Sequence, residues 1–287
     1  MEYKLLDGKD LAGRMKQAMK LEVQSMAEAG KTPGLAVVIV GNDPASRTYV
    51  NNKKKDCEEV GIKSFEYALP EETTEEQLLG LIDALNEDPA VDGILVQLPI
   101  PKHLDEIKVI RRIDPEKDVD SFHPFNVGEL LIGRPVFAPC TPAGVMELLK
   151  DAGIDVAGKN CVVVGRSNIV GKPMAMLMMH QNATVTICHS KTKDLKAVCK
   201  EADILIAAIG RADYITADYV KEGAIVIDVG MNRNQEGKLT GDCDFNSISK
   251  KVSAITPVPG GVGPMTRAML LKNTIKACNM HKKSLLS

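Results

Sequence analysis

Four short apolar runs recur in the C-terminal half of the chain, separated by segments of helical length. They cover residues 162–164, 183–188, 204–209 and 224–229. A strand that is buried on both faces of a parallel sheet has this kind of continuous apolar composition. The repeated strand and helix units predict a doubly wound parallel α/β sheet, in which a ligand binds at the carboxyl ends of the strands.

The first apolar run leads into a loop, Gly165 to Pro173, and then into a segment of helical composition over residues 174–180. Gly165 permits a tight turn, and Gly171 permits the close approach of a ligand or of the following helix. The N-terminal N–H groups and the dipole of that helix favour a pyrophosphate. The loop has only two glycines of the fingerprint G-x-G-x-x-G, so an ordinary β–α turn explains the loop alone equally well.

The end of the second apolar run indicates which dinucleotide the sheet prefers. An acidic residue at this place binds the ribose 2′-hydroxyl of NAD, but the chain has His189, Ser190 and Lys191 there. Together with Arg166 in the first loop, these cationic and hydroxyl groups suit a 2′-phosphate. The sequence therefore predicts NADP, and a solvated surface charge is the alternative reading of Arg166.

Length and composition restrict the class of protein. A chain of 287 residues can form two domains, and a net charge of −2 argues against nucleic acid as a partner. No run approaches the ~18 apolar residues of a membrane span, and the N-terminus lacks the apolar core of a signal peptide. We therefore expect a cytoplasmic protein that binds neither nucleic acid nor membrane. Seven cysteines without a C-x-x-C pair and five histidines without H-x-x-x-H spacing predict reduced thiols and no metal site.

The N-terminal half predicts a separate α/β unit. We expect strands over 35–40, 65–69 and 93–96 and helices over 10–29, 45–60 and 74–86. Tyr49 and Lys53 stand four residues apart and so share one face of the second helix, which begins at the carboxyl end of a strand. A tyrosine packed on a lysine stem is the alternative interpretation.

Three further segments are rich in proline. Residues 97–101 (QLPIP) hold Gln97 at the tip of a strand, although a rigid loop also explains them. Residues 114–125 carry Asp118 and Asp120 between the expected domains, where a linker is the simplest interpretation. Residues 255–266 contain three glycines and three prolines, which is typical of a loop that closes on a ligand.

Two helices are expected around the second domain. Thr141 precedes Pro142 and is the predicted N-cap of a helix over residues 143–151, with proline at the first helical position. A final amphipathic helix is expected over residues 265–278 and could return to the first domain.

Six segments, taken together and in this order, resemble the motifs of the bifunctional methylenetetrahydrofolate dehydrogenase/methenyltetrahydrofolate cyclohydrolase family across nearly the full length of the chain. They are Tyr49-x-x-x-Lys53, Gln97–Pro101, Lys117–Asp120, Pro139–Pro142, Gly165–Pro173 and Pro257–Thr266. Each motif is weak alone, but six in register are highly specific. The sequence shows no departure from the family pattern at these positions.

The resemblance implies a homodimer of two-domain α/β subunits with a folate cleft between the domains. Residues 1–120 correspond to the folate-binding catalytic domain and residues 140–264 to a Rossmann-like NADP-binding domain, with a helix over 265–280 packing back on the first domain. The implied activity is the oxidation of 5,10-methylenetetrahydrofolate by NADP, followed by hydrolysis of the methenyl product to 10-formyltetrahydrofolate, in one-carbon metabolism.

The resemblance also assigns residues by their match to the family motifs. Tyr49 is expected to stack on the pterin ring and Asp120 to anchor it. Lys53 is expected to be the catalytic acid/base, with Gln97 interacting with it. The further expected substrate contacts are Gly260, Gly261 and Pro264. The expected NADP contacts are Thr141, Gly165, Arg166, Ser167, Ile169, Gly171, Ser190, Gly210 and Thr266, and no metal is expected.

Two other function classes stay open on the residues themselves. A non-catalytic NADP-binding sensor needs the loop and the sheet, but it gives no reason for Tyr49, Lys53, Gln97 and Asp120 to occur together. An oxidoreductase for another small carbon substrate is compatible with the cofactor domain alone. The absorbance change on mixing the protein with methylenetetrahydrofolate and NADP distinguishes all three.

Overall fold

The chain forms two compact α/β units, which confirms the predicted fold class. The computed structural model describes residues 3–234 and 236–284. Unit 1 comprises residues 1–13 and 139–266, and unit 2 comprises residues 14–138 and 267–287. No helix within the described ranges is both long and apolar enough to cross a membrane.

Unit 1 contains a six-stranded parallel sheet. Its strand order is β1 (Lys4–Leu5), β11 (Ala254–Ile255), β8 (Ile225–Asp228), β7 (Ile204–Ala207), β5 (Asn160–Val164) and β6 (Thr184–Cys188). The four predicted apolar runs form β5 to β8. The chain reverses direction across the sheet at β5, because β6 lies on one side of it and β7 and β8 on the other. Ligand crevices of doubly wound sheets lie at such switch points.

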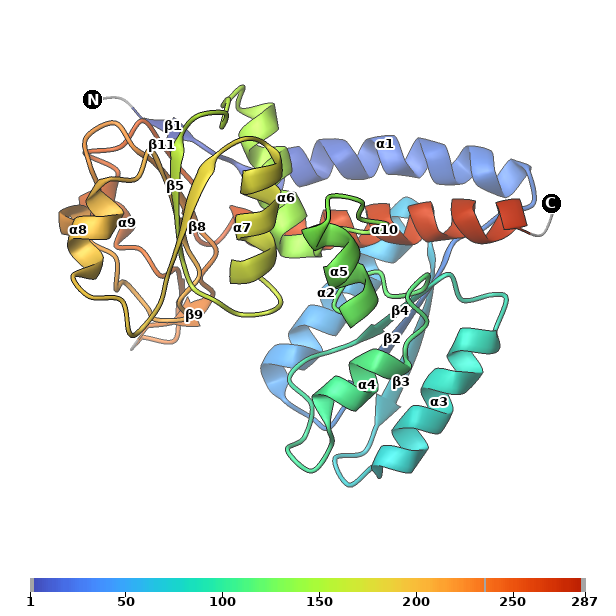
Figure 1. Cartoon of the computed structure of the whole chain (residues 1–287). Coiled ribbons are helices and arrows are strands. Elements are labelled where there is room, and N and C mark those ends of the chain that lie inside the picture. Colours follow the sequence, from blue (N-terminus) through green and yellow to red (C-terminus); the bar gives the residue numbers. More distant parts are fainter. Residues whose placement is uncertain (1–2, 235, 285–287) are drawn as a thin grey trace. The chain divides into compact units, whose positions relative to one another are not determined.

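Helices cover both faces of this sheet (Figure 1). On one face lie α6 (Cys140–Asp151) and α7 (Gly171–His180), and on the other α8 (Leu195–Lys200) and α9 (Phe245–Ile248). One 3₁₀ turn, η1 (Ala217–Tyr219), and the hairpin of β9 (Asn232–Arg233) and β10 (Leu239–Thr240) follow the later strands. Inward residues of the strands pack with α8, η1 and α9 in a single apolar cluster, which forms the core on that face of the sheet.

The predicted helix start at Thr141 is wrong. Helix α6 begins at Cys140 and has Pro139 at the N-cap, where no side chain accepts a cap hydrogen bond. The Thr141 hydroxyl instead lies 2.9 Å from the hydroxyl of Thr266. The hydroxyl that the local pattern assigned to capping therefore bonds a residue far away in the sequence instead.

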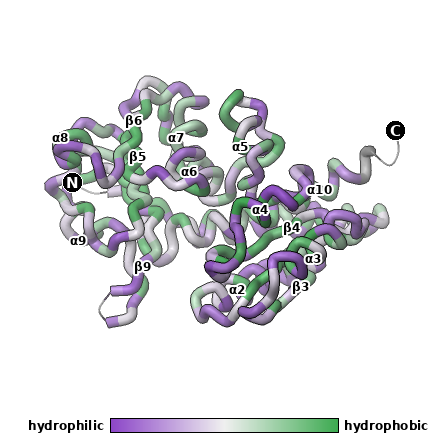
Figure 2. The backbone as a smooth tube through the Cα atoms, turned by 60° about the horizontal axis from the view of Figure 1, so that its bottom comes forward, coloured by the Kyte–Doolittle hydropathy of each residue, from purple (hydrophilic) through white to green (hydrophobic). Residues whose placement is uncertain are grey.

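Unit 2 is built on a three-stranded parallel sheet, β3 (Lys63–Leu69), β2 (Gly34–Val40) and β4 (Gly93–Val96). Every residue of the central strand β2 is buried, as its apolar run predicted. Helices α3 (Glu75–Glu87) and α4 (Glu106–Arg112) pack on one face, and α2 (Pro44–Val60) lies on the other (Figure 1). In the hydropathy colouring, β4 is drawn as hydrophobic (green), whereas the helices carry both hydrophilic (purple) and hydrophobic (green) residues (Figure 2).

Local signals set several helix ends in unit 2. Thr74 caps α3 with a complete capping box to Gln77. Helix α2 ends at Gly61, whose φ of 93° is left-handed and therefore suits glycine. The remaining helices are α1 (Gly8–Glu28), α5 (Pro124–Leu131) and α10 (Val262–Ser284). Because α10 begins at Val262, the last part of the predicted loop over 255–266 is helical.

The linker interpretation of residues 114–125 is wrong. The segment belongs to unit 2, and Lys117, Asp118 and Val119 in it are buried. Asp118 forms a parallel bridge with Ile94 of β4, so the segment extends the sheet. The Lys117 ammonium donates to the carbonyls of Leu85 and Asp88 at the end of α3. These hydrogen bonds satisfy a buried charge, whereas the lysine of a linker would be exposed to water.

Candidate active site

Helix α2 and strand β4 bring together the predicted acid/base and its partner. Lys53 Nζ donates to Gln97 Oε1 at 3.0 Å, and both side chains are partly buried. Gln97 follows β4 directly, its backbone N–H donates to the carbonyl of Val38, and its side-chain Nε2 donates to the carbonyl of Leu98. With its amide nitrogen bound, Gln97 presents its oxygen to Lys53. That oxygen accepts from an amine in either protonation state, so the contact holds Lys53 in place through a proton transfer.

Tyr49 lies one turn before Lys53 on the same face of α2 and is also half-buried. The helix starts immediately after β2, where Asp43 accepts a hydrogen bond from the N–H of Ser46 at 2.7 Å and Pro44 occupies the first turn. This start places the first turns of α2 beside the carboxyl end of the sheet. The sequence prediction that Tyr49 and Lys53 share a face at a strand end is therefore confirmed.

Asp120 is held near the same sheet end by the buried Asp118. The bridge from Asp118 to Ile94 is parallel, so the chain runs on from Asp118 toward the end of β4 that carries Gln97. The Asp118 carboxylate accepts from the His123 N–H and from Asn126 Nδ2, both at 2.8 Å. Burial raises the pKa of Asp118, and nearby Asp120 adds to this, while the hydrogen bonds oppose it. Asp118 thus fixes the turn that carries the half-buried Asp120.

In unit 1, the ends of β5 and β6 bring Arg166 and Ser190 close in register. Val164 pairs with Cys188, and the Gly165 N–H continues the ladder to the Cys188 carbonyl at 2.9 Å. Arg166 and Ser190, which follow within two residues of that pair, are both exposed. A guanidinium and a hydroxyl that follow the ends of two adjacent strands, one of them at the sheet's switch point, fit a phosphate group.

The loop from Gly165 to Gly171 is closely packed on backbone. A Cβ at Gly165 would lie 2.2 Å from the Ala208 carbonyl oxygen, and one at Gly171 would lie 2.3 Å from the Gly165 carbonyl oxygen. The Ser167 hydroxyl accepts from the N–H groups of residues 170 and 171 at 3.2 and 3.3 Å, at the start of α7. Ile169 is exposed at the tip. Both positions therefore require glycine, because backbone atoms of the chain lie too close for a Cβ. A tightly packed loop at a helix start is the arrangement that holds a dinucleotide phosphate.

Gly210 is positioned by a carboxylate that the sequence analysis missed. Asp242 is fully buried and accepts from the backbone N–H groups of Ile209, Gly210 and Arg211 at 2.5, 3.1 and 2.9 Å. It also accepts from Asn232 Nδ2 at 2.9 Å. Three consecutive N–H groups converge on one carboxylate, which fixes the loop that follows β7.

A second buried carboxylate, Asp228, adjoins Asp242 at the end of β8. It accepts from the N–H groups of Gly230, Asp242 and Cys243, each at 2.9 Å. Burial raises the pKa of Asp228 to about 6, the backbone hydrogen bonds oppose the rise, and the charge of Asp242 adds to it. The one sequence signal for this pair is an aspartate at the end of an otherwise apolar strand.

The raised pKa of Asp228 predicts a pH dependence of stability. The folded state binds a proton more tightly than the unfolded state does, so the contribution of Asp228 to stability decreases as pH rises from about 4 to about 6. We therefore expect Asp228→Asn to lower the free energy of unfolding more at pH 4 than at pH 7, by on the order of 2 kcal/mol. Denaturant midpoints of both proteins at the two pH values measure this, and a constant difference would contradict it.

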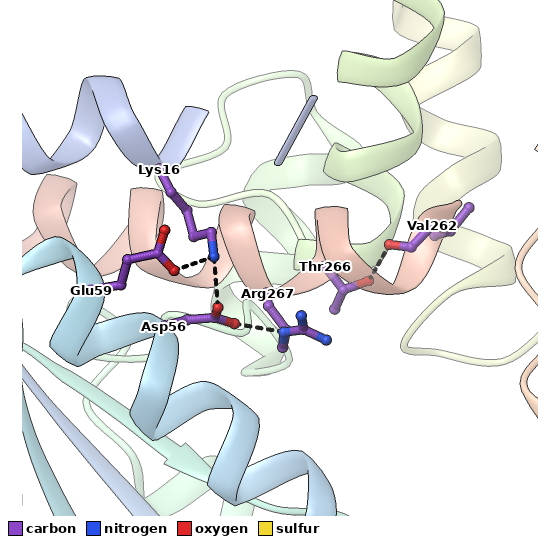
Figure 3. Close-up of polar contacts among 6 residues, drawn as sticks. All are labelled: Lys16, Asp56, Glu59, Val262, Thr266 and Arg267. Carbon is purple, nitrogen blue, oxygen red and sulfur yellow. Dashed lines mark hydrogen bonds and ion pairs between the residues drawn. The ribbon is translucent and has the colours of Figure 1, made fainter. Parts of the chain in front are cut away.

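The loop after β11 is tied to the start of α1. The Lys9 N–H donates to the Gly260 carbonyl at 2.8 Å, and a Cβ at Gly8 would lie 1.8 Å from the Gly261 carbonyl oxygen. Gly260 itself has a φ of 105°. Further on, the Thr266 hydroxyl lies 2.9 Å from the Thr141 hydroxyl. It also donates to the Val262 carbonyl at 3.3 Å (Figure 3). Pro264, in the first turn of α10, is half-buried.

The predicted residues thus form separate groups. Unit 2 brings Tyr49, Lys53, Gln97 and Asp120 to one end of its sheet. Unit 1 carries the predicted NADP residues at the ends of β5 to β7 and at the starts of α6, α7 and α10. Among the residues that the structure describes, no group of three or more histidine, cysteine, aspartate or glutamate side chains could hold a metal ion.

The fold and these groups define an α/β protein with a dinucleotide-type sheet in one unit and a lysine–glutamine pair at the sheet end of the other. The catalytic-domain model of the tetrahydrofolate dehydrogenase/cyclohydrolase family matches residues 6–120, and its NAD(P)-binding-domain model matches residues 139–282. The chain belongs to this family, and the resemblance seen in the sequence is confirmed.

Relatives agree over the full length. The bifunctional protein FolD of Acetivibrio thermocellus is 62% identical over 283 residues, which is 99% of each chain. The solved bifunctional FolD dehydrogenase/cyclohydrolase of Campylobacter jejuni has a TM-score of 0.96 and 52% identity, covering 97% of this chain and 99% of its own. The Trypanosoma brucei enzyme, solved with NADP and an inhibitor, has a TM-score of 0.95 and 38% identity, covering 99% of both chains.

Proposed function

We propose that the chain oxidises 5,10-methylenetetrahydrofolate to 5,10-methenyltetrahydrofolate with NADP and hydrolyses the product to 10-formyltetrahydrofolate. The contact that carries the proposal is the hydrogen bond from Lys53 to Gln97 at the carboxyl end of a parallel sheet. The full-length relatives named as bifunctional enzymes support both activities. NADP is supported by the family model and by the Trypanosoma brucei complex.

The dehydrogenase step depends chiefly on placement. Bound NADP would accept the hydride, and loss of that hydride leaves a cation stabilised between two nitrogens of the substrate. The chain's own residues then need only to hold the reacting carbon in position. We assign stacking on the pterin to Tyr49 and hydrogen bonding from the pterin N–H groups to Asp120, since both are half-buried near the end of the unit 2 sheet.

The hydrolytic step needs proton transfer. The attacking water must lose a proton, and the departing folate nitrogen must gain one, which is general acid–base work. We assign this work to Lys53, because its amine is positioned by an amide that tolerates either protonation state. Gln97 is then a positioning residue for Lys53.

Arg166 is expected to discriminate between the two dinucleotides. A bidentate charge-assisted contact with a 2′-phosphate is worth on the order of 2 kcal/mol, which corresponds to a change of about 30-fold. Arg166→Ala should therefore raise the KM for NADP by about this factor and change the KM for NAD little. Steady-state kinetics with both cofactors measure the ratio. Equal effects would make Arg166 the solvated surface charge of the alternative interpretation.

Assembly, location and domain roles are also part of the proposal. We assign folate binding and catalysis to residues 1–120, with a helix over 265–280 belonging to that part, and NADP binding to residues 140–264. A homodimer follows from the family resemblance, and light scattering of the purified protein tests it. A cytoplasmic location is supported by the five free, buried thiols of Cys57, Cys161, Cys188, Cys199 and Cys243, which suit a reducing compartment.

One assay tests the activity itself. The purified protein is mixed with 5,10-methylenetetrahydrofolate and NADP, and the absorbances of NADPH and of the methenyl product are followed together. We expect NADPH to form and the methenyl signal to rise and then decay. No NADPH with this folate would favour a different small substrate, and NADP binding without any turnover would favour a sensor.

A further inference from the structure

Asp56 continues the face of α2 that carries Tyr49 and Lys53. It follows Tyr49 by seven residues, or two helical turns, so the three side chains form a stripe about 10 Å long. The Asp56 side chain is buried, with 6% of the residue exposed. The stripe thus runs from the proposed pterin contact, past the acid/base, to a buried carboxylate.

Two cations from two other helices meet at Asp56 (Figure 3). Lys16 Nζ of α1 donates to Oδ1 at 3.0 Å, and Arg267 Nε of α10 donates to Oδ2 at 2.6 Å. Lys16 also bonds Glu59. Burial lowers the pKa of Lys16, but the hydrogen bonds that it donates to Glu59 and Asp56, together with the charges of these two carboxylates, outweigh burial and raise the pKa. Two carboxylates therefore share the charge of Lys16, whereas Arg267 has one carboxylate that it shares with Lys16.

Arg267 keeps donors available for a further anion. Among the described residues, its guanidinium bonds Asp56 through Nε alone, so four N–H groups on the two Nη atoms remain. The side chain is 29% exposed, which leaves it accessible to a ligand. A guanidinium held in one plane by its Nε bond is arranged to grip a carboxylate with two parallel hydrogen bonds.

We propose that Arg267, oriented by Asp56, binds the carboxylates of the glutamate tail of the folate substrate. This inference rests on the proposed function, since a folate is its ligand. A folate carries its pterin at one end and, beyond an aromatic amide, a glutamate with two carboxylates at the other. With the pterin on Tyr49, the stripe of α2 leads the tail toward Arg267.

The Nη donors of Arg267 favour this direction over the opposite one, since the nearby carboxylates of Asp56 and Glu59 are already bound by Arg267 Nε and Lys16. The N-terminal end of α2 is capped by Asp43, an exposed carboxylate that would repel an anionic tail. The C-terminal direction instead offers Arg267. Asp56 is the positioning residue in this arrangement, because it holds the guanidinium without touching the ligand.

The test compares two substrates that differ only in the glutamate. The hydrolysis of methenyltetrahydrofolate is measured beside that of the corresponding methenyltetrahydropteroate, which lacks the tail. We expect Arg267→Ala to raise the KM for the first substrate by about 10- to 100-fold, with kcat little changed and the KM for the second unaffected. Arg267→Lys should restore part of the preference for the tailed substrate, because lysine keeps the positive charge but cannot form two parallel hydrogen bonds to a carboxylate.

Two further variants separate ligand binding from a purely structural role. Asp56→Asn should raise the KM for the tailed substrate in the same direction but less, because the guanidinium keeps its charge and loses its anchor. Lys16→Met is the matched control: it removes the other cation on Asp56 and should leave the ratio of the two KM values at the wild-type level.

The outcomes are distinct. An active wild-type protein whose KM ratio is unchanged by Arg267→Ala would overturn the tail site and leave the proposed function intact, as would equal losses on both substrates. A wild-type protein that is folded but hydrolyses neither substrate would overturn the proposed function, and the tail site with it.

Discussion

Lys53→Met is expected to leave NADPH formation measurable while lowering methenyl hydrolysis by about 10²- to 10⁴-fold, the usual contribution of general acid–base catalysis. The methenyl intermediate should then accumulate during turnover. Methionine keeps the length and the apolar stem of lysine, so the helix face beside Tyr49 stays filled while the amine is lost.

The two half-reactions differ in what they ask of Lys53. Hydride loss creates positive charge on the substrate and requires no proton from the chain, so removal of the amine takes away little that this step needs. Hydrolysis requires a proton to leave the water and another to reach the folate nitrogen. On the proposed assignment, the hydrogen bond to Gln97 holds Lys53 for that exchange.

The measurement is the steady-state rate of both half-reactions on one folded preparation. Lys54→Met, a change at the exposed neighbouring lysine, is the control for altered charge on α2 and should leave both rates unchanged. If Lys53→Met hydrolyses at the wild-type rate, another group is the acid/base, and the face of Tyr49 and Lys53 is only a binding wall.

Many strands and helix ends could be predicted because they depend on residues that are close together in the sequence. The strands β2 and β7 and residues 161–164 of β5 are continuous apolar runs, and they are buried as such runs require. The ends of α2 and α3 follow from Gly61 and Thr74, whose conformational and hydrogen-bonding preferences act within one turn. The shared face of Tyr49 and Lys53 follows from helical spacing alone.

The errors arose where distant parts of the chain satisfy polar groups. Residues 114–125 look like a linker because they are charged, yet Lys117 is buried against the carbonyls at the end of α3. Thr141 has the local pattern of a cap, but its hydroxyl meets Thr266, 125 residues away. A single sequence carries no signal for either pairing.

The same limit applies to the site. Asp242 organises the loop of Gly210 from more than 30 residues away, and Asp56 meets Arg267 across 211 residues. Each aspartate looks like an ordinary polar residue in its own segment. The residues proposed for the chemistry could be named from motifs, whereas those that position them required the fold.

Gly171→Ala is the second variant with a large expected effect, and it should remove the other activity. The added Cβ would lie 2.3 Å from the Gly165 carbonyl oxygen and 2.8 Å from the Arg166 backbone nitrogen. Both neighbours are backbone atoms, so no side chain can turn away to make room. Gly165 is itself packed against the Ala208 carbonyl, so the loop must move outward and carry Arg166 with it.

A shift of about 1 Å in a positioned group can cost about 10²-fold in rate, so we expect NADP-dependent oxidation by Gly171→Ala to fall by at least that factor, largely through a higher KM for NADP. Hydrolysis of added methenyltetrahydrofolate should persist, because that step uses no dinucleotide and the acid/base proposed for it, Lys53, belongs to unit 2. Gly80→Ala is the matched control: a Cβ at this exposed helical position meets nothing within 4 Å and should stabilise α3 by up to about 1 kcal/mol. An unchanged KM for NADP in Gly171→Ala would show that the cofactor does not use this loop, whereas the expected result, set beside Lys53→Met, would make the two activities separable in both directions.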